Sequence, residues 1–506
     1  MPDVRTAAEL PIHLDRSAGS PLPAQLAAAL RNAIDGGALL PGEVVPATRN
    51  LASRLGVARG VVVTAYEQLT AEGYLSAGHG RGTRVSPDLG VAQAPAFLPG
   101  RASAAMPQAQ ARRADHAHSA RVTRPVGAAT VRRADPLPLA PGVPDTSSID
   151  RPAWRTAWRH AALRAHVEAP ELGDPRLRLE IAEHLRRTRG TTRTAQDVIV
   201  TAGTREGLGL LLTALGTTSG RGLVVGVEDP GYPSLRRVAA RHGAHIVALP
   251  VDAEGLDAGA LPVGMLDAII VTPSHQYPLG GSLPLARRRE LLAWATRTGA
   301  VIVEDDYDSE LRHTGSPLPA LAALDDPESG SVVLLGTFSK TVSQSLAAGY
   351  LLAPRRLRDL IEPVRRDLGG AVSAVVQSAL GDYLGSGELR RHTTRMRRRY
   401  AMRRETVLTH LSGVPGLKVR PMSGGLHAVL ELGVGERAPY VESRVIARST
   451  ECGLGAVPLS GYWQRHSHAT ERFGLVIGTG GSDGVQFDRA LSALREILVE
   501  EIGAGN

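Results

Sequence analysis

The chain has 506 residues, a formal net charge of +8 and a sequence pI near 9.9. A chain of this length exceeds one ordinary hydrophobic core, so we expect a small module beside a large one, or three lobes in all. The positive charge favours a polyanionic partner, although many basic proteins have none.

The cysteine content and the N-terminus indicate a reducing compartment. The single cysteine, Cys452, excludes an intramolecular disulfide and any cysteine-rich metal motif, and we expect it to be a small buried residue. Residues 1–14 lack the apolar core of a signal peptide, and no uninterrupted apolar stretch approaches the roughly 20 residues of a membrane span. The sequence therefore predicts a cytoplasmic protein with no membrane partner and no bound metal.

Residues 11–86 have the element order of a winged helix-turn-helix. Apolar residues recur at helical spacing over 22–34 and run into the stop Gly36-Gly37, and Thr48 is expected to cap a short second helix that ends at Gly56. A third helix follows, and its expected buried face consists of Val63, Tyr66, Leu69 and Thr70. The segment YLSAGHGRGTRV then predicts two short strands around a glycine-rich tip.

Residues 87–135 differ abruptly in composition from the segments on both sides. They are rich in Ala, Pro, Arg and Gln and have little aliphatic periodicity, which is typical of a disordered linker. As a flexible coil, the linker would separate its ends by roughly 35 to 40 Å on average. The two domains that it joins therefore need not touch.

Residues 136–506 alternate short apolar runs with helical stretches. The runs DVIVTAG, GLVVGVEDP, LDAIIVTP, AVIVEDDY and SVVLLGTFS are separated by helices of the length that joins parallel strands. The sequence predicts an α/β domain built on a mainly parallel sheet. After about residue 375 the pattern is first helical and then α+β, as in a smaller C-terminal lobe.

Lysine is rare in this chain, since only two of its 58 basic residues are lysines, Lys340 and Lys418. A lysine in a chain whose other basic residues are almost all arginines is a candidate for chemistry that arginine cannot perform, because lysine can lose its proton and form a Schiff base. Lys340 lies in GTFSK directly after an apolar run, at a strand end where open α/β sheets bind ligands. Lys418, in GLKVRP, is expected to be exposed.

The residues around Lys340 suit pyridoxal 5'-phosphate (PLP). Asp305 and Tyr307 follow the preceding strand, so the Asp can hold the pyridinium proton and the Tyr can donate to the ring oxygen. Asp306 and Asp308 are expected to face solvent or to cap the next element.

Further segments supply the remaining parts of such a site. TAGTREGLGLL opens a helix whose amides can hold a phosphate, EDPGYPSLRR supplies an aromatic residue that can stack on the ring, and TPSHQYPLGG supplies a loop near the same face. The candidate cofactor residues from these segments and from GTFSK are Gly203, Thr204, Arg205, Tyr232, Gln276, Thr337 and Ser339. For His275, a structural role in its loop is at least as well supported as a catalytic one.

The first module resembles the GntR superfamily of winged helix-turn-helix regulators over essentially its whole length. The resemblance implies that the third helix enters the major groove of DNA and that the wing tip enters the minor groove. The DNA-binding candidates are Arg49, Arg59, Thr64, His79, Gly80 and Arg81. Each arginine has a solvated surface charge as its alternative interpretation. Gly60 and Val61 stand where the superfamily usually has polar residues, so Arg59 and Thr64 carry more of the readout or phosphate contacts dominate.

Together with GDPRLRLEIAEHLRRTRG, the large-domain segments resemble the MocR/GabR family, in which a GntR-type domain is fused to a fold-type I, class-I aminotransferase-like domain. The resemblance implies a homodimer that uses PLP as effector or co-effector. Relatives usually carry a phosphate-binding arginine where this chain has Ala347, and we hypothesise that Arg205 replaces it. Arg472 and Arg465 are candidates for binding the carboxylate of an amino-acid-like effector.

Three functions remain open from the sequence. The leading hypothesis is a regulator that binds double-stranded promoter DNA and whose large domain senses PLP or an amino compound. The alternatives are a working PLP-dependent aminotransferase with a fused DNA-binding domain, and a regulator whose large domain no longer binds PLP. Ala347 and the unplaced carboxylate arginine disfavour turnover beyond weak or half-transamination, because full catalysis needs both anchors.

Overall fold

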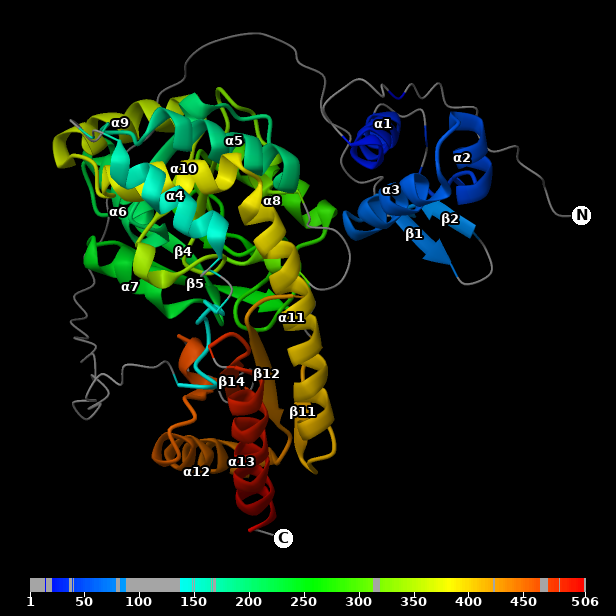
Figure 1. Ribbon diagram of the computed structural model, residues 1–506, viewed down its shortest axis with the longest axis vertical. Helices are drawn as coiled ribbons and strands as arrows, with labels where there is room; N and C mark the ends of the chain where they lie inside the picture. Colours follow the sequence, from blue (N-terminus) through cyan, green and yellow to red (C-terminus); the bar gives the residue numbers. More distant parts are fainter. Residues whose placement is uncertain are drawn as a thin grey trace, which may run out of the picture.

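The computed structural model describes most of the chain, with several gaps. The described residues are 14, 21–35, 39, 41–78, 82–87, 137–147, 149, 151–164, 166, 170–312, 319–421, 424–464, 472–481 and 483–504. The predicted linker lies outside them apart from Pro87, as do the wing-tip candidates His79, Gly80 and Arg81 and the candidate Arg465. The described chain forms a small N-terminal domain, a large domain and a C-terminal lobe (Figure 1).

The N-terminal domain has the predicted winged helix-turn-helix order. Its elements are α1 (Leu22–Asp35), α2 (Thr48–Leu55), α3 (Arg59–Ala71), β1 (Leu75–Gly78) and β2 (Gly82–Val85), with β1 antiparallel to β2. Helix α2 ends at Gly56 in the left-handed conformation, as predicted, but Thr48 is its first residue and Ala47 is the N-cap.

The predicted buried face of α3 was partly wrong. The buried residues of α3 are Val62, Ala65, Tyr66 and Leu69. Thr70 is exposed and Val63 is only partly buried. Positions 62, 65, 66 and 69 share one face at 3.6 residues per turn, whereas positions 63 and 70 share a neighbouring stripe.

The large domain is built on an eight-stranded sheet. The strands are β3 (Val198–Thr201), β4 (Val224–Asp229), β5 (His245–Asp252), β6 (Gly255–Leu256), β7 (Ala268–Val271), β8 (Val301–Asp306), β9 (Val332–Thr337) and β10 (Gly349–Leu352), in the order β3-β10-β9-β8-β7-β4-β5-β6. The contacts from β5 through β4, β7 and β8 to β9 are parallel, as predicted. Strand β10, which the sequence pattern did not predict, is antiparallel to both β3 and β9.

Two helical layers cover this sheet, and alternate strand residues face opposite layers. The helices of this domain are α4 (Pro152–Leu163), α5 (Pro175–Arg189), α6 (Thr204–Ser219), α7 (Pro233–Arg241), α8 (Leu285–Thr298), α9 (Arg355–Leu368) and α10 (Ala374–Gly385). Ile269 and Ile302 belong to the core that includes α5, α8 and α10, whereas Ile270 and Val303 belong to the core that includes α6, α7 and α9. Because both faces are buried, the strands read as continuous apolar runs.

The C-terminal lobe is a four-stranded sheet with helices packed on it. Helix α11 (Glu388–Leu411) runs from the large domain into this lobe, as Figure 1 shows. The other elements are β11 (Leu417–Val419), β12 (His427–Leu432), β13 (Val457–Pro458), β14 (Gly474–Gly478), α12 (Ala438–Glu451) and α13 (Gly484–Gly503). The sheet order is β11-β12-β14-β13 and its pairs are antiparallel. The predicted multidomain fold class is thus confirmed.

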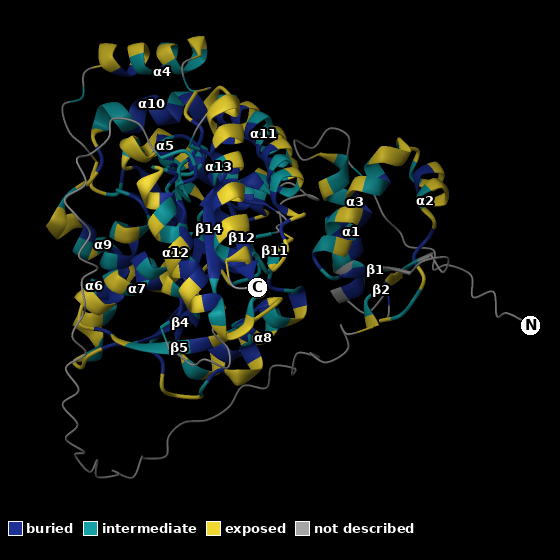
Figure 2. Ribbon diagram, turned by 90° about the horizontal axis from the view of Figure 1, so that it is seen from below, coloured by how far each residue is buried: buried dark blue, intermediate teal, exposed yellow. Residues whose placement is uncertain are grey.

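Short 3-10 helices complete the described structure. They are η2 (Ala195–Asp197), η3 (Ala258–Ala260), η4 (Ser309–Leu311), η5 (Leu321–Ala323), η6 (Gln344–Leu346), η7 (Gly435–Arg437) and η8 (Ser460–Tyr462). The buried residues lie along the strands and the inner faces of the helices, and the exposed residues lie on the outside of the helices (Figure 2). Within the described part of the chain, no helix is long and apolar enough to cross a membrane.

The N-terminal domain contacts the large domain at α8. Leu285, the first residue of α8, is 4% exposed and belongs to the apolar core of the winged helix-turn-helix. The Arg289 guanidinium donates to the Tyr74 hydroxyl at 2.8 Å and lies 5.2 Å from the Tyr74 ring centroid. The two domains therefore touch, although the length of the linker does not require it.

Candidate functional site

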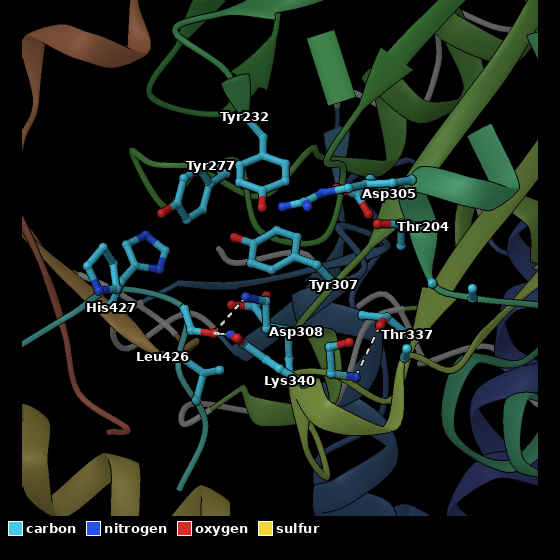
Figure 3. Close-up of a pocket in the computed structure, with 18 residues that line it drawn as sticks. Thr204, Tyr232, Tyr277, Asp305, Tyr307, Asp308, Thr337, Lys340, Leu426 and His427 are labelled. Carbon is cyan, nitrogen blue, oxygen red and sulfur yellow. Dashed lines mark hydrogen bonds between the residues drawn. The ribbon is translucent and has the colours of Figure 1, made fainter. Parts of the chain in front are cut away.

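A cavity of about 400 Å³ lies at the carboxyl ends of the central strands, between the large domain and the C-terminal lobe. It is lined by residues at or shortly after the carboxyl ends of β3, β4, β8 and β9 and by residues of the C-terminal lobe (Figure 3). In open α/β sheets this edge is where ligands bind, because the strand ends and helix N-termini meet there. The predicted cofactor residues that line it are Gly203, Thr204, Arg205, Tyr232, Asp305, Tyr307, Thr337, Ser339 and Lys340.

Lys340 lies in the wall of this cavity. Its Nζ donates a hydrogen bond to the carbonyl oxygen of Gly142 at 2.6 Å. Burial lowers the pKa of the Lys340 amine below its usual range; Asp308 and Asp305 oppose this shift and Arg205 adds to it. A lowered pKa increases the uncharged fraction of the amine, which is the form that attacks a carbonyl group.

Asp305 is the buried acid of the site. It is 4% exposed, and burial raises the pKa of its carboxyl group to about 8, with like-charged Asp306 adding to the shift and Lys340 opposing it. Its Oδ1 is buried and has no hydrogen-bond partner among the described residues. A buried oxygen left without a partner is costly, so this atom fits a ligand that brings a complementary nitrogen.

Three tyrosines form an aromatic wall of the cavity. The Tyr277 ring meets the Tyr232 and Tyr307 rings edge to face, with centroids 5.4 Å and 5.6 Å away. Burial raises the pKa of Tyr307 well above its usual range, so its hydroxyl keeps its proton. Tyr307 donates that proton to the backbone oxygen of His275 at 2.9 Å.

The N-terminus of α6 provides an anion site at one end of the cavity. Gly203 is the N-cap of this 16-residue helix, and Thr204 and Arg205 begin it. Helix N-termini attract anions through unpaired amides and the helix dipole. Strand β10 approaches closely here, since a Cβ on Gly349 would lie 2.8 Å from the Cα of Gly203. Ala347 lines the same cavity, with a left-handed φ of 43°.

Several sequence-predicted residues lie in places other than those expected. Asp308 was expected to face solvent or to cap the next element. It is the N-cap residue of η4, without a capping bond from its side chain, but it does not face solvent: it is 3% exposed and lines the cavity. Asp306 was also wrongly expected at the surface, because its carboxylate pairs with buried Arg189 at 2.8 Å. Cys452 is exposed rather than buried.

Two candidate ligand residues point away from the cavity. The Gln276 side chain is 1% exposed and donates to the backbone oxygens of Pro230 and Tyr277, each at 2.8 Å. The Arg472 side chain is 55% exposed and lies 3.4 Å from Glu431. Neither residue lines the cavity in the described part of the chain.

Other segments bring to the cavity residues that the sequence pattern did not identify. Gly142 and Gln344 meet there, because both Lys340 and Gln344 donate to the Gly142 oxygen, the latter at 2.8 Å. His427 enters from the start of β12 in the C-terminal lobe. A Pro/Gly-rich turn was the one local signal for Gly142, and nothing local marks His427.

The winged helix-turn-helix presents its described DNA-binding candidates to solvent. Arg49 on α2 and Arg59 and Thr64 on α3 are all exposed. The Arg59 guanidinium lies 3.4 Å from the hydroxyl of Thr48, which ties the start of α3 to the start of α2. Exposed cations at the start of these helices suit contacts with a phosphate backbone.

Two family models match separate parts of the chain. The model described as "Bacterial regulatory proteins, gntR family" matches residues 22–85, and the model "Aminotransferase class I and II" matches residues 135–436. The HTH-type pyridoxine biosynthesis transcriptional regulator PdxR of Corynebacterium glutamicum is 41% identical over 95% of this chain and 94% of its own. The chain belongs to the MocR/GabR family. As a MocR/GabR protein it is an HTH-type transcription regulator with an aminotransferase-like domain.

Other relatives support this family assignment. MocR of Rhizobium meliloti is 34% identical over 97% of both chains. The crystal structure of the multiple substrate aminotransferase of Thermococcus profundus has a TM-score of 0.63 and 21% identity, covering 74% of this chain and 94% of that one. At this identity the likeness supports the fold alone. GntR-type domains bind promoter DNA, and aminotransferases of class I and II depend on PLP.

Proposed function

We propose that this chain is a PLP-responsive transcription regulator that binds double-stranded promoter DNA and whose large domain holds PLP at Lys340. The observation that carries the proposal is the convergence of Lys340, the unpartnered Oδ1 of Asp305 and the α6 N-terminus on one cavity. When bound, PLP supplies an aldehyde that links to amines and an electron-withdrawing ring. The residues present fit each end of that group.

Each residue has a part in holding the cofactor. Lys340 would provide the attaching amine, and the protonated carboxyl group of Asp305 would provide the proton for the ring nitrogen. Tyr307 would donate to the ring oxygen, Tyr232 would cover the ring face, and the amides of Gly203, Thr204 and Arg205 would hold the phosphate with Thr337 and Ser339. The C-terminal lobe, which closes the cavity through His427, would shield the site from water.

We further propose that the effector is PLP itself or an amino compound that reacts at Lys340. The relative from Corynebacterium glutamicum is named for pyridoxine biosynthesis, which supports a vitamin B6 ligand. A ligand can change DNA binding only through its different affinities for two arrangements of the protein. The contact of α8 with Tyr74 would differ between two such arrangements. Helix α8 follows the loop that carries Tyr277, which lines the cavity, so a change at the cavity can reach this contact. The family resemblance supports a homodimer acting on DNA in the cytoplasm.

The cavity residues favour a large domain that binds its ligand over one that turns over a substrate. Arg472, the candidate for a substrate carboxylate, pairs with Glu431 outside the cavity lining. Ala347 offers no charge where relatives usually carry an arginine.

Two measurements on purified protein test the proposal. Wild-type protein should gain visible absorbance with PLP, and Lys340→Ala should lose it. Lys418→Ala, which changes the other lysine, should keep it. Promoter-fragment affinity, measured by fluorescence anisotropy, should change with PLP in wild type and not in Lys340→Ala. Wild-type protein without a PLP-dependent spectrum would refute the proposal, and multiple turnover of amino donors would favour an enzyme.

A further inference from the structure

A buried histidine-aspartate pair lies behind Tyr307. His275 is in the loop between β7 and α8, and Asp308 follows β8. The Nδ1 of His275 lies 3.0 Å from Oδ2 and 3.1 Å from Oδ1 of Asp308, and the two residues are 5% and 3% exposed. Because carboxylate oxygens accept hydrogen bonds, this contact places the imidazole proton on Nδ1.

His275 holds the Tyr307 hydroxyl at two points. Tyr307 Oη donates to the backbone oxygen of His275 at 2.9 Å and lies 3.1 Å from Nδ1 of the same residue. The two rings are stacked, with centroids 6.0 Å apart and planes at 21°. The phenol has one proton to donate and two lone pairs, so its oxygen can share Nδ1–H with the Asp308 carboxylate while its own proton goes to the carbonyl or to a ligand.

The C-terminal lobe closes the other side of the pair. Gly425 has a φ of 89°, and a Cβ there would lie 2.5 Å from Cε1 of His275 and 2.6 Å from Oδ2 of Asp308. The His427 ring centroid is 5.3 Å from that of His275, and burial lowers the pKa of His427 to about 4. His427 is therefore uncharged near neutral pH.

These residues also belong to the types that bind metal ions. Ligand atoms of His275, Asp308 and His427 lie within 4.8 Å of one another. His275 and Asp308 are, however, bonded to each other, and Nε2 of His427 lies 2.9 Å from the Pro278 oxygen. The contacts made by the described atoms favour a hydrogen-bonded pair.

We propose that His275 and Asp308 form a positioning pair that sets the Tyr307 hydroxyl toward the ring oxygen of PLP, a proposal that rests on the function proposed above. Tyr307 and Asp308 line the cavity, whereas His275 is absent from its lining among the described residues and so acts through Tyr307. If the Tyr307 proton turns to the cofactor, the bond to the His275 carbonyl is lost, and the contact of the phenol oxygen with Nδ1–H, which is shared with the Asp308 carboxylate, remains. The pair keeps the phenol oriented in both states.

Substitutions of His275 test whether Nδ1 or Nε2 of its ring orients the Tyr307 hydroxyl. His275→Ala should raise the Kd for PLP about tenfold, because Tyr307 loses the Nδ1 contact that orients its hydroxyl, at a cost of about one hydrogen bond. His275→Asn should restore most of the affinity, because the Asn amide nitrogen falls near the place of Nδ1, whereas His275→Gln should not. His245→Ala, at an exposed histidine of β5, is the control and should leave the Kd unchanged.

A double-mutant cycle separates positioning from general structural support. In a Tyr307→Phe background, which lacks the hydroxyl, His275→Ala should cause no further rise in the PLP Kd and no further change in the visible spectrum. Additive losses would overturn the proposal, as would an unchanged Kd in His275→Ala. If His275→Ala fails to fold by circular dichroism, Asp308→Asn serves in the same cycle. A wild-type protein that does not bind PLP would instead refute the proposed function.

Discussion

Asp305→Asn tests whether the buried acid of the cavity keeps its proton near neutral pH. Burial raises the pKa of Asp305 from its ordinary 3.8 to about 8. Between these two values the unfolded chain has lost the proton while the folded protein retains it. The free energy of unfolding of the cofactor-free protein therefore falls as pH rises from about 4 to about 8, and stops falling from this cause above about pH 8.

The size of the effect follows from the width of this window. One proton difference changes the free energy of unfolding by about 1.4 kcal/mol for each pH unit. Between about pH 5 and about pH 7 the wild-type protein should therefore lose about 3 kcal/mol that Asp305→Asn does not lose. Contributions of distant titrating groups cancel in the difference between the two proteins.

Urea unfolding of the large domain at the two pH values measures this difference. Asp367→Asn, at an exposed position of α9, is the matched control and should follow the wild type. Glu228→Gln tests the electrostatic coupling between Glu228 and Asp305, because Glu228 is buried and raises the pKa of Asp305. If Asp305→Asn and wild type lose stability in parallel, Asp305 is ionised in the folded protein and the reasoning fails.

Three further predictions concern the anion site, the DNA surface and the domain contact. Arg205→Gln should raise the PLP Kd about tenfold in spectroscopic titrations, because a charge-assisted bond to the phosphate is lost. Arg59→Ala should weaken DNA binding for all sequences and lower the slope of log K against log salt by about one, measured by anisotropy. Leu285→Ala should destabilise the contact between the domains by about 2 kcal/mol and speed proteolysis of the N-terminal domain.

Matched variants give each of these tests its control. Arg237→Gln, at an exposed position of α7, should leave the PLP Kd unchanged, and a normal Kd for Arg205→Gln would show that Arg205 does not replace the missing arginine. Lys418→Ala should leave the salt slope unchanged. A proteolysis rate for Leu285→Ala equal to that of wild type would mean that the two domains are not held together through α8.

The sequence predicted the parts of this protein that depend on local pattern. Continuous apolar runs identify strands buried on both faces, and the residue after such a run lies at the carboxyl end of the sheet. That rule by itself places Lys340, Asp305 and Tyr307 at one edge of the sheet, where the cavity lies. The rarity of lysine marked Lys340 independently. The sequence pattern did not predict strand β10, because a strand of four residues is too short to show a clear periodicity.

Local sequence pattern did not predict the contacts between side chains that the packing of loops and lobes determines. Gln276 and Tyr277 are neighbours in sequence, yet Tyr277 lines the cavity and Gln276 bonds to backbone oxygens behind it. Which of two adjacent side chains faces the ligand depends on the course of the loop, and that course is set by its packing. Arg472 likewise turned to Glu431 because a carboxylate of the neighbouring strand was available.

By itself, the sequence determined the order of domains and marked the lysine and the acid that line the cavity, since strands and their ends are encoded by nearby residues. Only the tertiary structure decided that Gly142 meets Lys340 and that Asp308 turns inward to His275. It also decided that the C-terminal lobe brings His427 to the cavity. These contacts join segments far apart in the chain, and their free energy comes from burial that exists only after the lobes have packed.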